Sequence, residues 1–124
     1  MEKTRTKVTE LDENLKVLLS KSTYKFGAFT FDVAKRELAF QNESTELTKK
    51  ETYLLVLFVA NANKLMERRY MLKTIWHDDS YFAGRTMDVY ICKLRKLLNK
   101  DSKINIVNSH GEGYKLLVNQ IDLG

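Results

Sequence analysis

The stretch that decides the fold is residues 85–100, which read RTMDVYICKLRKLLNK. At 100° per residue, four apolar side chains fall near one line and predict a buried helical seam: Met87, Ile91, Leu94 and Leu98. The opposite face is basic and free of acids, and its members are Arg85, Val89, Lys93, Lys96 and Lys100, bordered by Thr86 and Cys92. The segment therefore predicts a surface helix with one buried side and one positive side.

The net charge of the chain is concentrated in the same segment. Residues 85–100 carry five basic side chains and one acid, Asp88, for a charge of +4 out of a total of +5. Residues 1–23 add +1, and the remainder sums to zero. A positive field from one short segment fits an element that binds a polyanion. Charge alone is equally consistent with a solvated helix face.

Two charged residues lie between the two faces of this helix. Asp88 is in the first turn, where the helix dipole favours a carboxylate. We expect it to have a structural role, either orienting the helix start or pairing with a base such as Arg95. Arg95 itself lies about 80° from the seam, which fits a contact with a phosphate backbone and an internal ion pair equally well.

The residues before this helix predict strands and a first helix. From Tyr24 onward apolar and polar residues alternate, and turn residues divide the stretch into three or four short strands of an antiparallel β-meander. Thr48 and Glu51 then have the spacing of a capping box, which opens a helix. Its expected buried stripe is Leu54, Leu55, Phe58 and Ala62.

A second helix and a terminal hairpin complete the predicted fold. The second helix is expected over about 67–76, and a polar loop over 77–84 separates it from the third. Its inward residues are expected to be Leu72, Ile75 and Trp76. Residues 104–108 and 114–118 are β-prone and are joined by a turn that contains glycine. This order predicts an α+β winged helix-turn-helix with an N-terminal antiparallel β-meander, three helices and a C-terminal β-hairpin wing.

Residues 1–23 are expected to stand apart from a domain over residues 24–124. Apolar side chains recur there at helical spacing, and they are Val8, Leu11, Leu15, Leu18 and Leu19. The sequence shows no evident partner for this short amphipathic helix, and the segment is too short for a domain of its own. We interpret it as a linker or as the remnant of a preceding domain.

Composition bounds the class of protein. A chain of 124 residues that is 44% hydrophobic suits one folded domain. It has no apolar run near the ~20 residues that span a bilayer and no signal segment, so we expect a cytoplasmic protein without a membrane partner. Cys92 is its only cysteine, which excludes an internal disulfide and a multi-cysteine zinc site.

Three features could belong to an enzyme, and each has a simpler interpretation. His77, Asp78 and Asp79 include metal-ligand types, but three adjacent residues cannot all face one ion. Cys92 has no histidine or acid paired with it in the sequence and is interpreted as a bystander. The glycines beside Glu112 lack the third glycine and the following helix of a nucleotide loop. We predict no enzymatic activity, cofactor or metal.

Several motifs in order resemble the OmpR/PhoB family of response-regulator output domains. Residues 85–98 are similar to the recognition helix of that family, and residues 110–114, HGEGY, resemble its wing with a G-x-G-Y signature. Further matches at the first and second helices are Leu47, Thr48, Glu51, Leu54, Leu55, Leu72 and Trp76. The likeness extends over about 24–118.

The resemblance implies how such a domain is used. In this family a phosphorylatable receiver domain, controlled by a histidine kinase, precedes the output domain. Phosphorylation promotes dimerisation, and dimers bind tandem direct repeats near promoters. No receiver is evident in this chain, so we expect an excised output domain, with residues up to Lys21 as the last receiver helix or linker. It should be a monomer when isolated and a dimer on DNA.

The resemblance also implies the contacts with double-stranded DNA. The third helix enters the major groove and the wing reaches the minor groove, so the expected DNA-contacting residues are Arg85, Thr86, Val89, Tyr90, Lys93, Arg95, Lys96, Asn108 and His110. By their chemistry, Val89 and Thr86 suit a thymine methyl, and Lys93 suits guanine acceptors. The loop before the helix often contacts RNA polymerase in the family, which implies that role for His77, Asp78, Asp79, Ser80 and Tyr81.

Some positions depart from the family pattern. His110 stands where Arg is frequent and Asn108 where Thr is frequent, so we expect wing affinity to be lower or dependent on pH. Cys92 occupies a position that is often basic or polar, and one contact is expected to be missing there. Lys49 replaces a frequent proline at a first-turn position that accepts either.

The main alternative is a winged helix that docks on protein or RNA, because a fold does not fix a function. The acid-free basic face weighs against it. Six aromatic residues are interpreted as core rather than as base-stacking platforms, namely Phe26, Phe29, Phe31, Phe40, Tyr53 and Trp76. Tyr114 could pack beneath the wing, and Tyr90 could hydrogen-bond a phosphate.

Overall fold

Antiparallel strands form the first layer of the computed structural model, which describes residues 13–119 and 121–122. The strands are β1 Thr23–Phe26, β2 Phe29–Asp32, β3 Glu37–Phe40, β4 Glu43–Glu46 and β8 Ile121–Asp122, in the order β4-β3-β2-β1-β8. Alternate side chains such as Tyr24, Phe26 and Phe31 point into the core. The predicted meander is confirmed, and a further strand that the sequence pattern does not indicate, β8, pairs with β1.

The first predicted helix, α3 (Lys49–Ala60), begins as expected. The Thr48 hydroxyl accepts a hydrogen bond from the Glu51 N–H at 3.2 Å, and the Glu51 carboxylate accepts one from the Thr48 N–H at 2.8 Å. The buried surface is wider than the predicted stripe, because residues 54–59 are all fully buried. Ala62 lies beyond the helix end and is only partly buried.

An N-terminal helix, α2 (Glu13–Leu19), packs against α3. Leu15 is fully buried in the core, and Leu18 and Leu19 are partly buried against it. The Tyr24 hydroxyl donates to the Leu18 carbonyl at 2.7 Å. This helix therefore has a partner that the sequence did not reveal. Val8 and Leu11, the other two predicted apolar positions, lie outside the described residues.

The next segment combines a short strand with the second predicted helix. Its elements are β5 Leu65–Glu67, α4 Arg68–Met71 and the π-helical turn η1 Leu72–Trp76. The expected helix over 67–76 is thus confirmed to within one residue. Leu72 and Ile75 are buried, Trp76 is partly buried, and His77 ends the element in a left-handed conformation.

The third helix, α5 (Tyr81–Leu98), begins earlier than predicted. The expected loop over 77–84 ends at Ser80, whose hydroxyl accepts a hydrogen bond from the Ala83 N–H at 3.2 Å and caps the helix. The predicted start at Arg85 is wrong by four residues, because this cap allows the helix to begin one turn earlier. The predicted seam is confirmed, since Met87, Ile91, Leu94 and Leu98 are buried.

The predicted hairpin forms the wing, with strands β6 (Asn105–Asn108) and β7 (Gly113–Leu117). β5 pairs with β7 and gives a second sheet in the order β5-β7-β6. This pairing requires glycine at position 113, because a Cβ there would collide with the Met66 carbonyl oxygen. At the tip, the Asn108 side-chain oxygen accepts from the Gly111 N–H at 3.2 Å.

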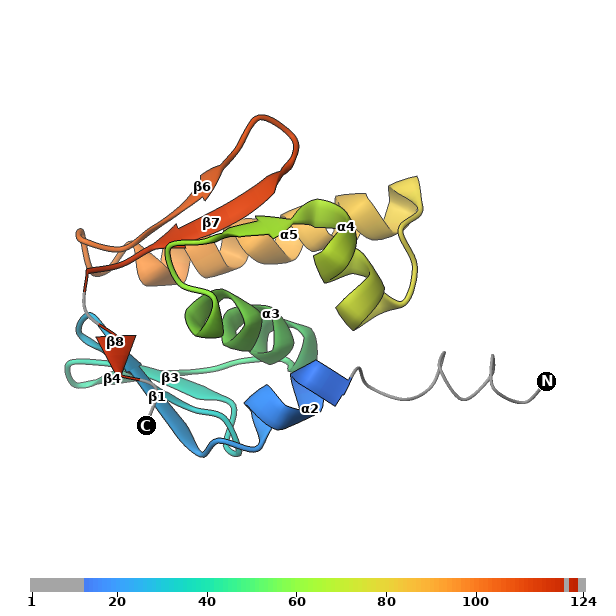
Figure 1. Cartoon of the computed structure of the whole chain (residues 1–124). Coiled ribbons are helices and arrows are strands. Elements are labelled where there is room, and N and C mark those ends of the chain that lie inside the picture. The colour runs from blue at the N-terminus through green and yellow to red at the C-terminus, as the bar shows by residue number, and fades with distance from the viewer. Residues whose placement is uncertain (1–12, 120, 123–124) are drawn as a thin grey trace.

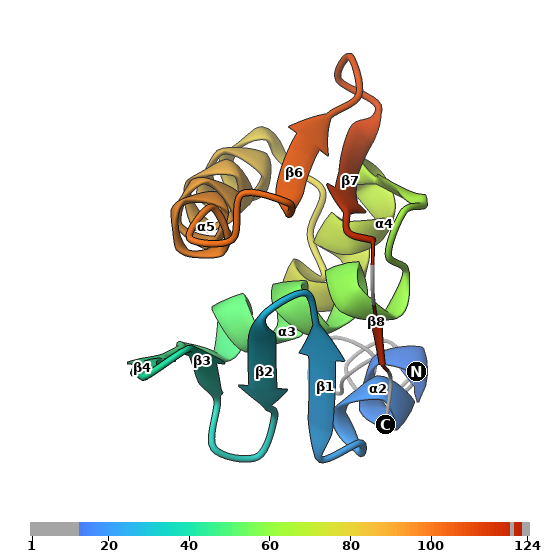
Figure 2. The same ribbon diagram turned by 90° about the vertical axis from the view of Figure 1, so that its left-hand side faces the viewer.

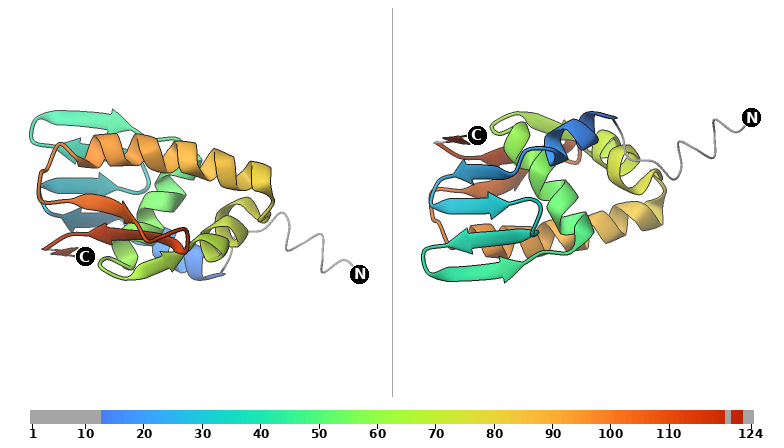
Figure 3. Two further views of the ribbon diagram at one scale, coloured as in Figure 1. Left: turned by 90° about the horizontal axis from the view of Figure 1, so that it is seen from above. Right: turned by 90° about the horizontal axis from the view of Figure 1, so that it is seen from below.

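α3 lies between two layers (Figure 1). The first sheet covers one side of it, and α5 with the wing covers the other (Figure 2). Seen from above, α5 and the β6–β7 hairpin lie side by side on one face of the domain (Figure 3). The arrangement confirms the predicted winged fold. In residues 13–119 and 121–122, no helix has the length and apolarity to cross a membrane.

Candidate nucleic-acid interface

The outward side of α5 carries the predicted basic face. Arg85, Thr86, Val89, Lys93 and Lys96 are all exposed, and the Val89 side chain is 56% exposed although it is apolar. The seam residues on the opposite side are at most 1% exposed. The structure therefore brings these five predicted helix residues together on one surface.

Three cations on this surface make no ion pair with any of the described residues. The Arg85 guanidinium donates to the Tyr81 hydroxyl at 2.9 Å and lies 5.8 Å from the centre of that ring. The Lys93 ammonium lies 5.8 Å from the centre of the Tyr90 ring. Lys96 makes no hydrogen bond or ion pair with any described residue. Their charge is therefore available to an anion.

Tyr90 of α5 and Lys100 are anchored to neighbouring elements, and Lys100 lies beyond the end of the helix at Leu98, so the helix is shorter at this end than the predicted segment 85–100. Tyr90 is partly buried, and its ring centre lies 5.8 Å from that of Trp76. Lys100, a member of the predicted basic face, pairs with Glu43 of β4 at 2.9 Å. Lys100 is thus held by the first sheet, 57 residues away in the sequence.

Asp88 has the structural role expected of it, with a different partner. Both carboxylate oxygens accept hydrogen bonds from the Arg68 guanidinium, at 2.7 and 3.0 Å, and one also accepts from the Tyr114 hydroxyl at 2.9 Å. The proposed pairing with Arg95 is therefore wrong. The Arg68 hydrogen bonds, followed by that from Tyr114, hold the pKa of Asp88 below its ordinary value. Burial, followed by the bond to Asp88, raises the pKa of Tyr114.

The flank of α5 contacts the wing through Arg95 as well. The Arg95 Nε donates to the Ile106 carbonyl in β6 at 3.0 Å, and the side chain is partly buried. Tyr114 is 7% exposed and packs beneath the wing, as anticipated. Asn108 and His110 are exposed toward the end of the hairpin, where His110 has a positive φ of 50°. The two predicted wing residues thus lie together at the wing tip.

A family model for the transcriptional regulatory protein, C terminal, matches residues 42–116, from the β3–β4 turn through the wing. The chain belongs to the OmpR/PhoB family of regulatory C-terminal domains. The resemblance that the sequence motifs carried is confirmed. The residues matched by the family model begin just before β4 and end within β7.

Individual relatives agree with this family. The chain is 54% identical over 96 residues to the transcriptional regulatory protein RprY of Bacteroides fragilis, covering 77% of this chain and 41% of that protein. It spans about two fifths of the length of the curated relatives that it matches.

Solved structures show the same fold. The response regulator DrrB, an OmpR/PhoB homologue from Thermotoga maritima, has a TM-score of 0.65 at 28% identity over 77% of this chain and 44% of that chain. The DNA-binding domain of RstA from Klebsiella pneumoniae, in complex with the RstA box, has a TM-score of 0.64 at 26% identity over 77% of this chain and 96% of that chain.

In this OmpR/PhoB-type domain the loop before α5 is braced by its own acids. Both Asp78 oxygens accept hydrogen bonds from Ser80, and Asp79 pairs with Arg69 at 3.1 Å. Within the described ranges, no group of three or more His, Cys, Asp or Glu side chains lies close enough to hold a metal ion. Tyr81, placed in this loop by the sequence analysis, belongs to the first turn of α5 and is 70% exposed.

Two residues that belong to this surface or support it, Phe82 and Arg68, are not among the predicted site residues. Phe82 is 79% exposed and lies about 40° from Lys96 around α5, at the head of the outward face. A helix start assigned to the capping residue Ser80 would have placed Phe82 in the first turn of α5. Arg68 reaches Asp88 from 20 residues away, and no local pattern indicates this pair.

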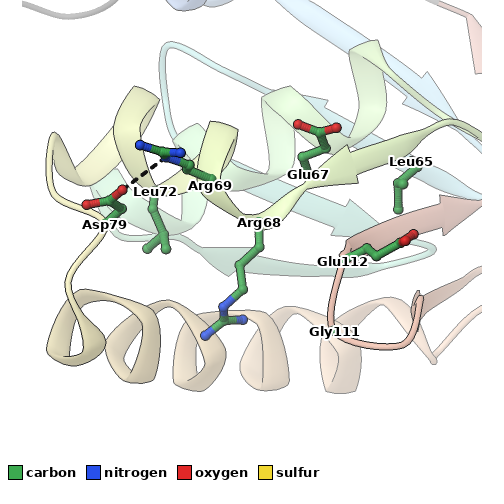
Figure 4. Close-up of a pocket in the computed structure, with 8 residues that line it drawn as sticks. All are labelled: Leu65, Glu67, Arg68, Arg69, Leu72, Asp79, Gly111 and Glu112. Carbon is green, nitrogen blue, oxygen red and sulfur yellow. Dashed lines mark hydrogen bonds and ion pairs between the residues drawn. The ribbon is translucent and has the colours of Figure 1, made fainter.

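A hollow of about 590 Å³ is lined by residues of β5, α4 and the wing tip (Figure 4). Its lining includes Leu65, Glu67, Arg68, Arg69, Leu72, Asp79, Gly111 and Glu112. Arg69 faces Asp79 there, whereas the Arg68 side chain leaves the hollow and extends toward α5. The Arg68 side chain therefore joins α4 to α5.

Proposed function

We propose that this domain binds double-stranded DNA sequence-specifically and thereby controls transcription. α5 lies in the major groove, and the β6–β7 wing reaches the minor groove. The observation that carries the proposal is the outward surface of α5, where Arg85, Lys93 and Lys96 lack ion pairs among the described residues and surround the exposed Val89. Such a surface offers both phosphate neutralisation and apolar contact with bases.

The residues of α5 divide between positioning and base recognition. Lys93 donates to guanine acceptors, whereas Lys96 neutralises a phosphate. Val89 contacts a thymine methyl. The Thr86 hydroxyl already donates to the Phe82 carbonyl at 3.1 Å, which leaves the Thr86 methyl for the same kind of contact.

The remaining predicted contacts lie on the flank and the wing. Tyr90 directs its hydroxyl to a phosphate, and Arg95 uses the guanidinium nitrogens that the Ile106 carbonyl does not occupy. At the wing tip, Asn108 and His110 contact the minor groove. The exposure of both side chains supports this assignment.

We further propose that the surface before α5 contacts RNA polymerase. Support comes from the exposed ring of Tyr81, which follows the loop from His77 to Ser80 along the chain. Asp78 and Asp79 hold that loop in shape. Phe82 extends this surface with a second exposed ring, 5.9 Å from that of Tyr81 between centroids.

The regulation of the full protein follows from the family. We propose a receiver domain upstream, phosphorylated by a histidine kinase, and dimers that assemble on tandem direct repeats in the cytoplasm. The share of RprY that this chain covers, 41%, leaves room for such a receiver. The isolated domain is a monomer that binds without catalysis.

Selection of random duplexes against the purified chain at two salt concentrations tests the proposed function. We expect enrichment of one sequence, present as a direct repeat, with affinity that falls as salt rises because phosphate contacts release counterions. A selection without enrichment would contradict sequence-specific binding and would favour a docking module, for which the exposed Tyr81 and Phe82 are the natural contact.

A further inference from the structure

α5 is tied to the wing at two points along one flank. Asp88 accepts a hydrogen bond from Tyr114 of β7 at 2.9 Å, and Arg95 donates to the Ile106 carbonyl of β6 at 3.0 Å. These two positions of α5 are seven residues apart and lie about 20° apart around the helix. Each strand of the wing is therefore held by one residue of the same helix flank.

Arg68 joins the same contact from a third element. Its guanidinium makes two hydrogen bonds to Asp88, at 2.7 and 3.0 Å, and its backbone N–H donates to the Glu112 carbonyl at the wing tip at 3.0 Å. A two-pronged guanidinium–carboxylate pair fixes orientation as well as distance. Arg68 thus holds α5 with its side chain and the wing with its backbone.

Two glycines make room for this arrangement. A Cβ at Gly84 in α5 would approach the Arg68 Nη2 to 2.8 Å, and a Cβ at Gly113 would collide with the Met66 carbonyl of β5. Glycine is a poor helix former, so its presence at position 84 lowers the stability of the helix and leaves room for the Arg68 side chain.

We propose that Asp88, Arg68 and Tyr114 form a clamp that sets the position of the wing relative to α5, so that one duplex meets both. This rests on the proposed DNA binding. The three residues are positioning residues and do not touch DNA: the Tyr114 hydroxyl donates to Asp88 and the Asp88 carboxylate is occupied by Arg68. Without the clamp, α5 still enters the major groove, but the wing no longer meets the adjacent minor groove.

The Tyr114→Phe variant tests the clamp, because it removes one hydroxyl and keeps the buried ring. Tyr24→Phe is a matched control, since Tyr24 is also buried and donates its hydroxyl to the Leu18 carbonyl, away from the wing. Affinities for the selected duplex and for a random duplex are measured with the full chain, together with thermal unfolding. Cleavage by hydroxyl radicals, which attack sugars from the minor groove, reports where the wing lies.

We expect Tyr114→Phe to weaken binding to the selected duplex by up to about tenfold, because the hydrogen bond to Asp88 no longer holds the wing in position before DNA binds. Minor-groove protection should be lost, and random-duplex affinity should be unchanged. Tyr24→Phe should lower only the unfolding temperature. Asp88→Asn should reproduce the Tyr114→Phe result, and it serves as the test if Tyr114→Phe does not fold.

Two different failures can be told apart. If wild type binds a selected duplex but Tyr114→Phe keeps its minor-groove protection, or loses no more affinity than Tyr24→Phe, the clamp is overturned and DNA binding stands. If the wild-type chain has no preferred duplex, the proposed function fails and the clamp fails with it.

Discussion

α3 and α5, the two longest helices of the described chain, are buried in opposite ways. In α3, residues 54–59 are fully buried on every side, because one sheet packs below the helix and the wing layer packs above it. In α5 the buried residues are those of the seam together with Ala83 and Gly84 in the first turn, and the outward side carries Val89 and three cations without ion pairs among the described residues. A helix that is apolar all round is a core element, whereas an amphipathic one leaves a face available for binding. We therefore assign stability to α3 and recognition to α5.

The largest expected effect is the difference in the free energy of unfolding between a substitution in α3 and one in α5. Phe58→Ala in α3 removes a fully buried ring and should lower the free energy of unfolding by about 3–5 kcal/mol. Val89→Ala in α5 should leave that free energy nearly unchanged and weaken DNA binding instead, because Val89 is 56% exposed. Urea unfolding measures both. A comparable loss of stability from Val89→Ala would break the assignment.

The next expected effect is on DNA affinity, and it distinguishes a base contact from a phosphate contact on α5. Lys93→Ala should weaken binding to the selected duplex by about 1–3 kcal/mol and relax the sequence preference. Lys96→Ala should weaken binding to all duplexes alike and make the salt dependence shallower. Lys35→Ala, in the β2–β3 turn of the first sheet, is the control for loss of charge. Equal losses on selected and random duplexes from both α5 variants would refute the division.

A smaller effect concerns the acid on the flank of α5. Because its pKa is lowered in the folded state, chiefly by Arg68, the Asp88 carboxylate stabilises the fold above its ordinary pKa. That contribution should disappear as the pH falls below about 4 and passes through the lowered value. Wild type should therefore lose stability more steeply in acid than Asp88→Asn, measured by urea unfolding from pH 7 to pH 3. A stability difference between the two proteins that does not vary with pH would contradict this.

The smallest expected effect is at Lys100, which lies just beyond the C-terminal end of α5. Lys100 is already paired with Glu43, so Lys100→Ala should reduce DNA affinity less than Lys96→Ala and change stability by less than about 1 kcal/mol. Glu43→Gln frees the Lys100 ammonium, and it should raise random-duplex affinity at low salt. A Lys100→Ala loss as large as that of Lys96→Ala would place Lys100 on the DNA.

The sequence predicted the features of these helices that depend on near neighbours. The capping box of α3 needs only Thr48 and Glu51, and the seam of α5 needs only helical spacing, so both were found. The wing was also found, because its strands and turn are contiguous. The start of α5 was misplaced because Gly84 and two exposed aromatic residues conceal the helix that Ser80 caps.

The contacts that were missed join residues far apart in the chain. Asp88 pairs with Arg68 and Tyr114, 20 and 26 residues away, and Lys100 pairs with Glu43 across 57 residues. The burial of Leu15 likewise depends on α3. Such pairs follow from packing, which periodicity does not report. The structure groups five of the predicted DNA contacts on the outward surface of α5 and two at the wing tip, and the list as a whole stays a prediction.

Backbone amide shifts during titration with the selected duplex test the assignment of recognition to α5 most directly. We expect the largest changes in nuclear magnetic resonance spectra at Arg85, Val89, Lys93 and Lys96, with further changes at Asn108 and His110. The buried residues of α3 and the strands of the first sheet should change little. Changes centred on the first sheet, or on Tyr81 and Phe82 without the rest of α5, would contradict the assignment.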